Sequence, residues 1–137
     1  MRLELRPGTE MTLRALRALA GGRRMTAAEL AEPAGTTPAN AAHLVAPLVR
    51  AGWVRSWPGP TGGHELVVDL RQISLLGLIE AVEGPTEDGR CVMAPRDCPA
   101  PHPCAVHDVW ARAREALLRE LAATALISID NEAEVIR

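Results

Sequence analysis

The 137-residue sequence contains no phenylalanine, no tyrosine and no lysine. Trp53, Trp57 and Trp110 are therefore its only bulky aromatic side chains, and the rest of a core must come from Leu, Ala, Val and Ile. Small aliphatic side chains favour closely packed helices over a large β-sandwich. Because 47% of the residues are hydrophobic, the chain can still bury a core the size of one domain.

The sequence also lacks long apolar runs. None approaches the ~20 residues that cross a bilayer, and the N-terminus has no signal-peptide pattern. We therefore expect a cytoplasmic protein that does not engage a membrane. Three cysteines cannot all pair within one chain, and a reducing cytosol disfavours structural disulfides. Metal binding or redox chemistry is the better explanation for Cys91, Cys98 and Cys104.

The net charge of −2 is divided unevenly along the chain. Residues 1–74 hold nine arginines and six acidic residues, a balance of +3, whereas residues 75–137 hold six arginines and eleven acidic residues, a balance of −5. A positive front half and a negative rear half suit a protein that presents one face to nucleic acid. Charge alone does not distinguish this interpretation from a random scatter of surface residues.

Start and stop signals predict three helices in the first half, at about residues 9–20, 27–33 and 38–50. Thr26 and Glu29 form a capping box at the start of the second helix. Thr37 is placed to cap the third helix, with Pro38 at its first position. Helix, short helix, tight turn and helix at this spacing predict a helix-turn-helix.

A β-hairpin is predicted directly after these helices. Residues 53–57 and 64–68 have the composition of strands, and the Pro- and Gly-rich residues 58–63 form the turn between them. A hairpin in this position is a wing. The alternative is an ordinary helical hairpin packed against a small β-ribbon.

The second half is expected to contain two more helices. Ser74 caps a helix that runs to about Val82, and a long helix runs from about His107 to Ala125 with an apolar stripe. The stripe could belong to an intramolecular core, but in so small a protein it favours packing against a second copy. Residues 130–137 are expected to form a loosely held polar tail. The predicted fold is thus mostly α with a small β-wing, with these segments: a winged helix-turn-helix at 1–72, a connecting helix at 73–90, a cysteine loop at 91–104, and a dimerisation helix and tail at 105–137.

The cysteine spacing is typical of a metal centre. Thiolates bind zinc and iron–sulfur clusters, and structural zinc sites usually place their cysteines two to four residues apart. Here the gaps are six and five residues, and the second is rich in proline. The spacing therefore favours a cluster, with zinc or free thiols as the alternatives. Glu10 and His107 both remain candidates for a fourth ligand.

With these features in place, the chain resembles the IscR/NsrR-type winged-helix iron–sulfur transcriptional repressors over nearly its whole length. The resemblance is carried, in order, by Met1-Arg2-Leu3, Glu10 to Leu16, Arg50 to Ser56, Gly59 to Gly63, Ile73 to Leu76, Glu80 to Gly84 and the three cysteines. It implies a bacterial dimer that binds double-stranded DNA and holds an iron–sulfur cluster, either 4Fe–4S or 2Fe–2S, on Cys91, Cys98 and Cys104.

The resemblance also implies two different fourth ligands. In the family's nitric-oxide sensors an acidic residue of the partner subunit completes the site, and Glu10 matches it if two extra residues around Pro7-Gly8 are allowed for. In the iron–sulfur-assembly regulators a histidine three residues after the last cysteine does so, and His107 matches that position. Arg14 matches an arginine that would steady the acidic ligand. Of the two residues, we slightly favour Glu10 as the fourth ligand.

The chain departs from the family pattern at several positions. The first cysteine gap is one residue longer than usual, Pro58 stands where the wing commonly has arginine, and His64 replaces the wing aromatic. Pro47 lies inside the predicted recognition helix, where it removes a hydrogen bond and should bend the chain. These departures affect the DNA sequence preference and affinity rather than the fold.

A set of residues is expected to meet DNA. The recognition helix would read bases, two arginines would contact phosphates, and the wing would approach the backbone or minor groove. In that order the residues are Thr37, Asn40 and His43; Arg50 and Arg55; and Gly62, Gly63 and His64.

The sequence thus predicts a DNA-binding repressor whose cluster senses nitric oxide, redox state or cluster supply. The alternative is a zinc-bound or metal-free winged-helix regulator that acts through a protein partner. Cys104 and His107 could suggest a nucleophile and a base, but the sequence has no oxyanion-type glycine loop, so we do not expect an enzyme.

Overall fold

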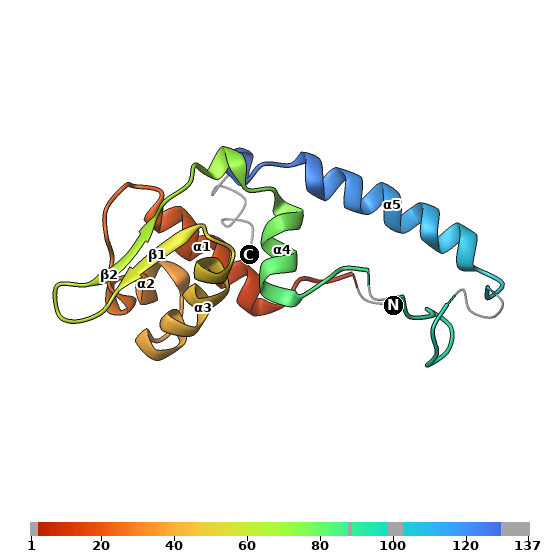
Figure 1. The fold of residues 1–137 in the computed structure, drawn as a ribbon, viewed down its shortest axis with the longest axis horizontal. Helices are drawn as coiled ribbons and strands as arrows, with labels where there is room; N and C mark the ends of the chain where they lie inside the picture. The colour runs from red at the N-terminus through yellow and green to blue at the C-terminus, as the bar shows by residue number, and fades with distance from the viewer. Residues whose placement is uncertain (1–2, 88, 99–102, 130–137) are drawn as a thin grey trace.

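The computed structural model describes residues 3–87, 89–98 and 103–129 (Figure 1). The tail expected at 130–137 lies outside these residues. The elements, in order, are α1 Pro7–Leu19, α2 Ala27–Ala34, α3 Pro38–Arg50, β1 Val54–Trp57, β2 Gly63–Leu66, the 3-10 turn η1 Leu70–Gln72, α4 Leu75–Glu83, α5 His107–Ala123 and the 3-10 turn η2 Leu126–Ser128. The prediction of a mostly helical fold with a small β-wing is confirmed.

The core lies where α1 to α4 meet, and it is built without any fully buried aromatic side chain among the described residues. Leucine and isoleucine fill it, contributed by α1, α2, α3, α4 and the segments that flank α4 and follow α5. The largest fully buried apolar side chains are Leu16, Leu19, Leu30, Leu48, Ile73, Leu78 and Leu126. Close packing of these small side chains is what the missing Phe and Tyr led us to expect.

The predicted capping box at the start of α2 is confirmed. The Glu29 N–H donates to Thr26 Oγ1 at 3.2 Å, and the Thr26 N–H donates to Glu29 Oε1 at 3.1 Å. The helix ends one residue beyond the predicted 27–33, and Pro33 lies inside its last turn. The helix ends because Gly35 adopts a left-handed φ of 72° and the Thr36 N–H then bonds back to the Ala31 carbonyl at 2.9 Å.

Helix α3, the predicted recognition helix, starts and ends as predicted. Thr37 Oγ1 accepts the Asn40 N–H at 3.2 Å, and Pro38 occupies the first turn. The helix runs through Pro47 to Arg50 without interruption. Pro47 cannot donate a hydrogen bond to the His43 carbonyl, and the buried apolar face of the helix, Ala41, Leu44, Val45 and Leu48, spans this position.

The wing is an antiparallel pair, β1 with β2, in which Val54 faces Leu66 and Trp57 faces Gly63. It is fastened to the loop between α1 and α2, because the Met25 N–H donates to the His64 carbonyl at 2.9 Å and the His64 N–H donates to the Met25 carbonyl at 2.7 Å. A Cβ at Gly63 would lie 2.8 Å from the Met25 carbonyl oxygen, so only glycine allows this approach.

Helix α5 extends from the winged-helix body towards the cysteine loop (Figure 1). Its C-terminal end is joined to the start of α4, since the Leu75 N–H donates to the Thr124 carbonyl at 2.8 Å and the Leu126 N–H donates to the Ile73 carbonyl at 2.9 Å. At 1.5 Å per residue, a helix of 17 residues is about 25 Å long. A single uninterrupted helix, α5, therefore connects the cysteine loop to the winged helix.

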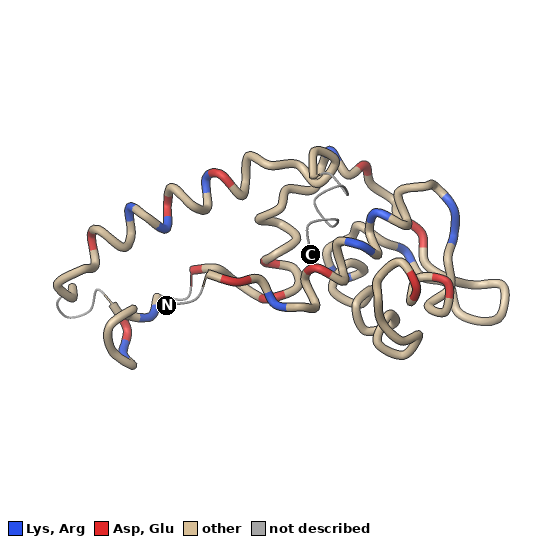
Figure 2. The backbone as a smooth tube through the Cα atoms, turned by 180° about the vertical axis from the view of Figure 1, so that it is seen from behind, with Lys and Arg blue, Asp and Glu red and all other residues tan. Residues whose placement is uncertain are grey.

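Charge is distributed differently over the two parts. Figure 2 shows basic segments on α1 and on the loop between α1 and α2, whereas basic and acidic residues alternate along α5. In the part of the chain that the structure describes, none of the helices is both long and apolar enough to cross a membrane.

Candidate metal centre and DNA-binding face

The three cysteines gather at one point. The Sγ atoms of Cys91, Cys98 and Cys104 all lie within 4.8 Å of one another, and each residue is half-buried. All three are thiols rather than halves of a disulfide. The sequence-based prediction that these residues form one cluster of donors is thus matched by their placement.

A small hairpin explains how the long first gap is accommodated. The Cys91 N–H donates to the Arg96 carbonyl at 2.8 Å, and the Cys98 N–H donates to the Gly89 carbonyl at 3.0 Å. Arg90 and Asp97 pair as an antiparallel bridge between these bonds. Because Cys91 and Cys98 lie on opposite arms, the six residues between them turn back and bring the two sulfurs together.

The surroundings of the sulfurs are not equivalent. The Met93 N–H points at Cys91 Sγ at 3.4 Å and lowers the pKa of that thiol, because a donated hydrogen bond stabilises the thiolate. Partial burial raises the pKa of the Cys104 thiol, because removal from water disfavours the charged form. Cys91 is therefore prepared to become a thiolate, the form that binds metals.

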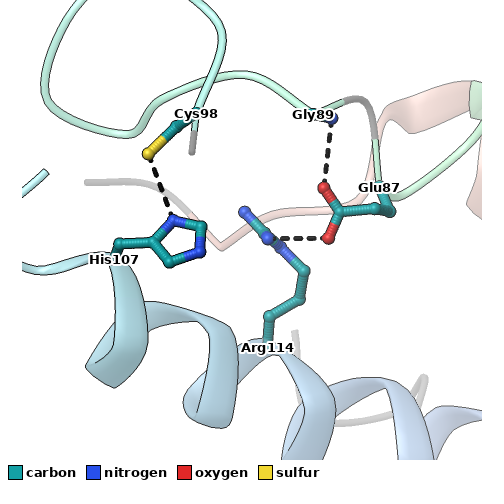
Figure 3. A network of polar contacts seen from close by, with 5 residues as sticks. All are labelled: Glu87, Gly89, Cys98, His107 and Arg114. Atoms are coloured by element: carbon teal, nitrogen blue, oxygen red, sulfur yellow. Dashed lines mark hydrogen bonds and ion pairs between the residues drawn. The ribbon is translucent and has the colours of Figure 1, made fainter. Parts of the chain in front are cut away.

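His107 adjoins the cysteine cluster. It is the first residue of α5, and its Nδ1 lies 3.1 Å from Cys98 Sγ (Figure 3). The first turn of a helix thus presents an imidazole to the thiols. Of the two predicted fourth ligands, His107 is the one that a single chain brings to the site.

Glu10 lies in the other part of the molecule. It belongs to α1 and forms an ion pair with Arg14, with Oε1 2.8 Å from Nη2. Figure 1 places α1 in the winged-helix body and the cysteine loop near the opposite end of α5. The predicted contact between Glu10 and Arg14 is present, and a second copy of the chain would have to bring Glu10 to the thiols.

A cavity of about 260 Å³ lies beside the sulfurs, lined by the three cysteines with His107, Trp110 and Arg114 among its neighbours. A donor set of three thiols fits a thiophilic metal centre, and the imidazole of His107 lies beside one of them, Cys98. The spacing of the sulfurs suits one tetrahedral ion, for which Zn–S bonds of 2.3 Å place sulfurs about 3.8 Å apart, and the adjoining cavity leaves room for a larger iron–sulfur core.

The residues predicted to read DNA divide into two groups. His43, Arg50 and Arg55 are exposed. The Asn40 amide instead donates to Thr36 Oγ1 at 2.8 Å and lies 3.8 Å from the sulfur of Met11, so it is turned inward. Thr37 is exposed, but its hydroxyl oxygen is occupied in capping α3.

The predicted wing contacts are also engaged within the protein. The Ser56 hydroxyl is hydrogen-bonded to His64 Nδ1 at 2.7 Å, and burial lowers the pKa of His64. A Cβ at Gly62 would collide with the Trp57 carbonyl oxygen, so Gly62 is required by packing inside the wing, as Gly63 is by its approach to Met25. The absence of a side chain at both positions therefore has a structural reason within the protein itself.

Arg24 was not singled out from the sequence, although the structure places it at the base of the wing. Its guanidinium lies 3.7 Å from the ring centroid of Trp57, a cation–π contact, and 4.0 Å from the Glu65 carboxylate. Arg55 approaches the same ring at 5.8 Å. The arginine pair before the Thr26 cap was the available signal, but a sequence does not show which ring lies beside an arginine.

Comparison with known proteins identifies the family. Residues 5–131 match the Rrf2 family, described as iron-dependent transcriptional regulators. None of the curated proteins matches the sequence.

Several solved structures share the fold. CymR (YrzC), the global cysteine regulator of B. subtilis, is 25% identical, with a TM-score of 0.68 over 91% of this chain and 94% of that one. CymR of Staphylococcus aureus is 27% identical, with a TM-score of 0.65 over 88% and 93%. T. potens IscR is 20% identical and has the same fold, with a TM-score of 0.64 over 100% and 92%.

The match covers nearly the whole chain, and it agrees with the three-helix front, the wing and the long rear helix. The expected resemblance is confirmed, and so is the expectation that the protein is not an enzyme. The chain belongs to the Rrf2 family of DNA-binding transcriptional regulators.

Proposed function

We propose that this Rrf2-family regulator is a cytoplasmic repressor that holds an iron–sulfur cluster on Cys91, Cys98 and Cys104 and binds its operator according to the state of that cluster. The cavity beside the three gathered thiols, in a chain that belongs to a family described as iron-dependent regulators, supports this proposal most directly.

The thiolates would supply three ligands, and a weaker oxygen or nitrogen donor the fourth. A bound cluster supplies an electron-transfer centre that nitric oxide and oxidants can attack. His107 from the same chain and Glu10 from a second copy are the two candidates for the fourth position. A donor of this kind, weaker than a thiolate, would be the ligand that a small molecule displaces most easily.

Helix α5 is the proposed route from the centre to DNA. His107 lies at the end beside the thiols, and Thr124 follows the other end and accepts the Leu75 N–H. Arg17 of α1 also donates to the Ile129 carbonyl just beyond α5. A rearrangement of the cysteine loop that shifts α5 would therefore reach α4 and α1, on which the recognition helix packs.

The same helix is the proposed dimer interface. None of its seventeen residues, all of which the structure describes, is buried, and Val109 and Leu117 are 60% and 44% exposed. An apolar groove runs between α5 and the N-terminal segment before α1, with Leu3, Leu5 and Leu121 in its walls. Exposed apolar patches mark interaction sites. A second copy of α5 would cover this one in a symmetric dimer.

The DNA-binding face is proposed to centre on the exposed part of α3 and the wing. His43 would reach base edges from the start of the recognition helix, while Arg50 and Arg55 would contact phosphates. Thr37, Gly62, Gly63 and His64 would contribute backbone or hydroxyl contacts, since their other groups are used inside the protein.

Purification without oxygen, followed by an absorption spectrum with iron and sulfide analysis, tests the proposed centre. We expect a brown protein with iron and sulfide bound, and loss of colour in a Cys98→Ser variant. Glu10→Ala and His107→Ala, made separately, identify the fourth ligand, because only loss of the true ligand changes the spectrum. A colourless protein with stoichiometric zinc would contradict the iron–sulfur proposal.

Such a zinc result would support a second candidate function, a zinc-stapled winged-helix regulator that acts through a protein partner. The close spacing of the three sulfurs favours it, since a single tetrahedral ion holds its sulfurs about 3.8 Å apart. The metal analysis decides between the two.

A further inference from the structure

A closed ring of polar contacts joins the cysteine loop to α5 (Figure 3). Arg114 Nη1 donates to Glu87 Oε2 at 2.8 Å, and Glu87 Oε1 accepts the Gly89 N–H at 3.1 Å. The Gly89 carbonyl accepts the Cys98 N–H at 3.0 Å, and Cys98 Sγ lies 3.1 Å from His107 Nδ1. His107 and Arg114 both belong to α5, which completes the ring.

The two helix residues of the ring are placed to hold a loop. Seven residues make almost two full turns, so His107 and Arg114 project from the same face of α5, about 10 Å apart along its axis. Glu87 precedes the cysteine hairpin and Cys98 lies on its second arm. The hairpin is therefore attached to the helix at two points, and only one of these, Cys98, is a candidate metal ligand.

We propose that Glu87 and Arg114 are positioning residues of the thiol centre: their ion pair holds the cysteine hairpin against α5 and so links the sulfurs to the helix that reaches the winged helix. This inference rests on the proposed function of the three cysteines as a metal centre. Neither residue is itself a proposed metal ligand. The pair therefore acts only through the loop that carries Cys91 and Cys98.

Two observations separate this pair from an ordinary surface ion pair. Exposed pairs contribute little by themselves. Here Glu87 is 57% exposed, but the Arg114 side chain is only 24% exposed and Glu87 also receives a backbone N–H. Arg114 and Trp110 each line both the cavity beside the thiols and the apolar groove of the proposed dimer interface. The pair thus lies in the wall between the centre and that interface.

The ion pair can be tested on the reduced, metal-free protein with Co²⁺ alone as the probe. Thiolate ligation of Co²⁺ gives a charge-transfer absorption band, and its titration measures the affinity of the site. Residues that orient metal ligands typically change affinity about 10- to 100-fold, and we expect a loss in that range for Glu87→Gln and for Arg114→Gln. Amide hydrogen exchange of residues 89–98 should accelerate in both variants.

Two further variants make the test specific. Arg114→Lys keeps the positive charge and should restore most of the Co²⁺ affinity. Arg119→Gln removes the exposed Arg119–Glu115 pair of the same helix, 3.3 Å long, and should change neither the affinity nor the exchange rates. Thermal unfolding of all variants confirms that the fold is intact.

Wild-type affinity and exchange rates in Glu87→Gln and Arg114→Gln would overturn the proposal. An equal loss in Arg114→Lys and Arg114→Gln would overturn the assignment to an ion pair. Both readouts use protein without its native cofactor. A purified protein that lacks iron would therefore refute the proposed function while leaving this inference standing.

Discussion

The guanidinium of Arg24 lies 3.7 Å from the ring centroid of Trp57, so the loop between α1 and α2 covers the base of the wing. The adjacent residue, Met25, extends this contact with two backbone hydrogen bonds to His64. These contacts fasten the wing to the helical body. If the wing meets DNA as proposed, it would lose less conformational freedom on binding than an unattached hairpin.

Replacement of Arg24 by alanine should loosen the wing. Loss of an exposed cation–π contact is expected to lower the free energy of unfolding by about 0.5–1 kcal/mol, as measured by urea denaturation. The near-UV circular dichroism of Trp57 should weaken at the same time. Arg23→Ala serves as the control, since Arg23 pairs with Glu29 at 3.6 Å rather than with the ring. An unchanged tryptophan signal in Arg24→Ala would show that the stack is not maintained in solution.

Gly63→Ala should destabilise the protein more than Gly59→Ala does. Both glycines have a positive φ, 127° and 87°, and an L-residue in such a strained conformation costs about 1–3 kcal/mol. Only at Gly63 would the new Cβ also press on the Met25 carbonyl, at 2.8 Å, because a Cβ at Gly59 meets open space. Equal unfolding free energies for the two variants would mean that the wing moves away from Met25 at no cost.

The stability of the wing should depend on pH through His64. Burial lowers the pKa of His64 in the folded protein, so the unfolded chain binds this proton more readily. Stability is therefore lost as the pH falls through the unfolded value of about 6.5. Comparison of the melting temperature of the wild type with that of His64→Gln between pH 5 and 8 isolates this effect. The variant should lose less stability on acidification; a parallel decline in both proteins would argue against it.

The sequence predicted those contacts of the fold and the site whose partners are close in sequence and follow a known pattern. The caps at Thr26 and Thr37 were predicted because their partners lie three residues away. The inward turn of Asn40 was not predicted, because its amide contacts Met11 of another helix as well as the nearby Thr36 hydroxyl.

The pairing of Glu87 with Arg114, 27 residues apart, also has no local pattern that reveals it. The clustering of the cysteines was predicted from composition and spacing, whereas the hairpin that brings Cys91 to Cys98 depends on backbone bonds across Gly89 and Arg96. The ends of α2 and α3 were predicted to within one residue, at 33 and 50, because Gly35 and the Ala51-Gly52 pair are local stop signals.

The apolar face of α5 yields a prediction about assembly. Leu117→Glu places a charge in the proposed dimer interface and should shift the protein towards the monomer in sedimentation equilibrium. Ala122→Glu adds the same charge at an exposed position of α5 outside the groove and should leave the assembly unchanged. Identical molecular masses for the two variants would place the dimer contact elsewhere.

The central claim is that the state of the thiol centre sets the affinity for DNA. Its most direct test is the dissociation constant for a DNA fragment selected by the protein from a random pool, measured anaerobically before and after nitric oxide treatment. We predict a change of about 5- to 150-fold, the usual range of coupling between two sites, and no change in a Cys98→Ser variant. A wild-type protein that contains iron and sulfide but binds the fragment equally well in both states would contradict the claim.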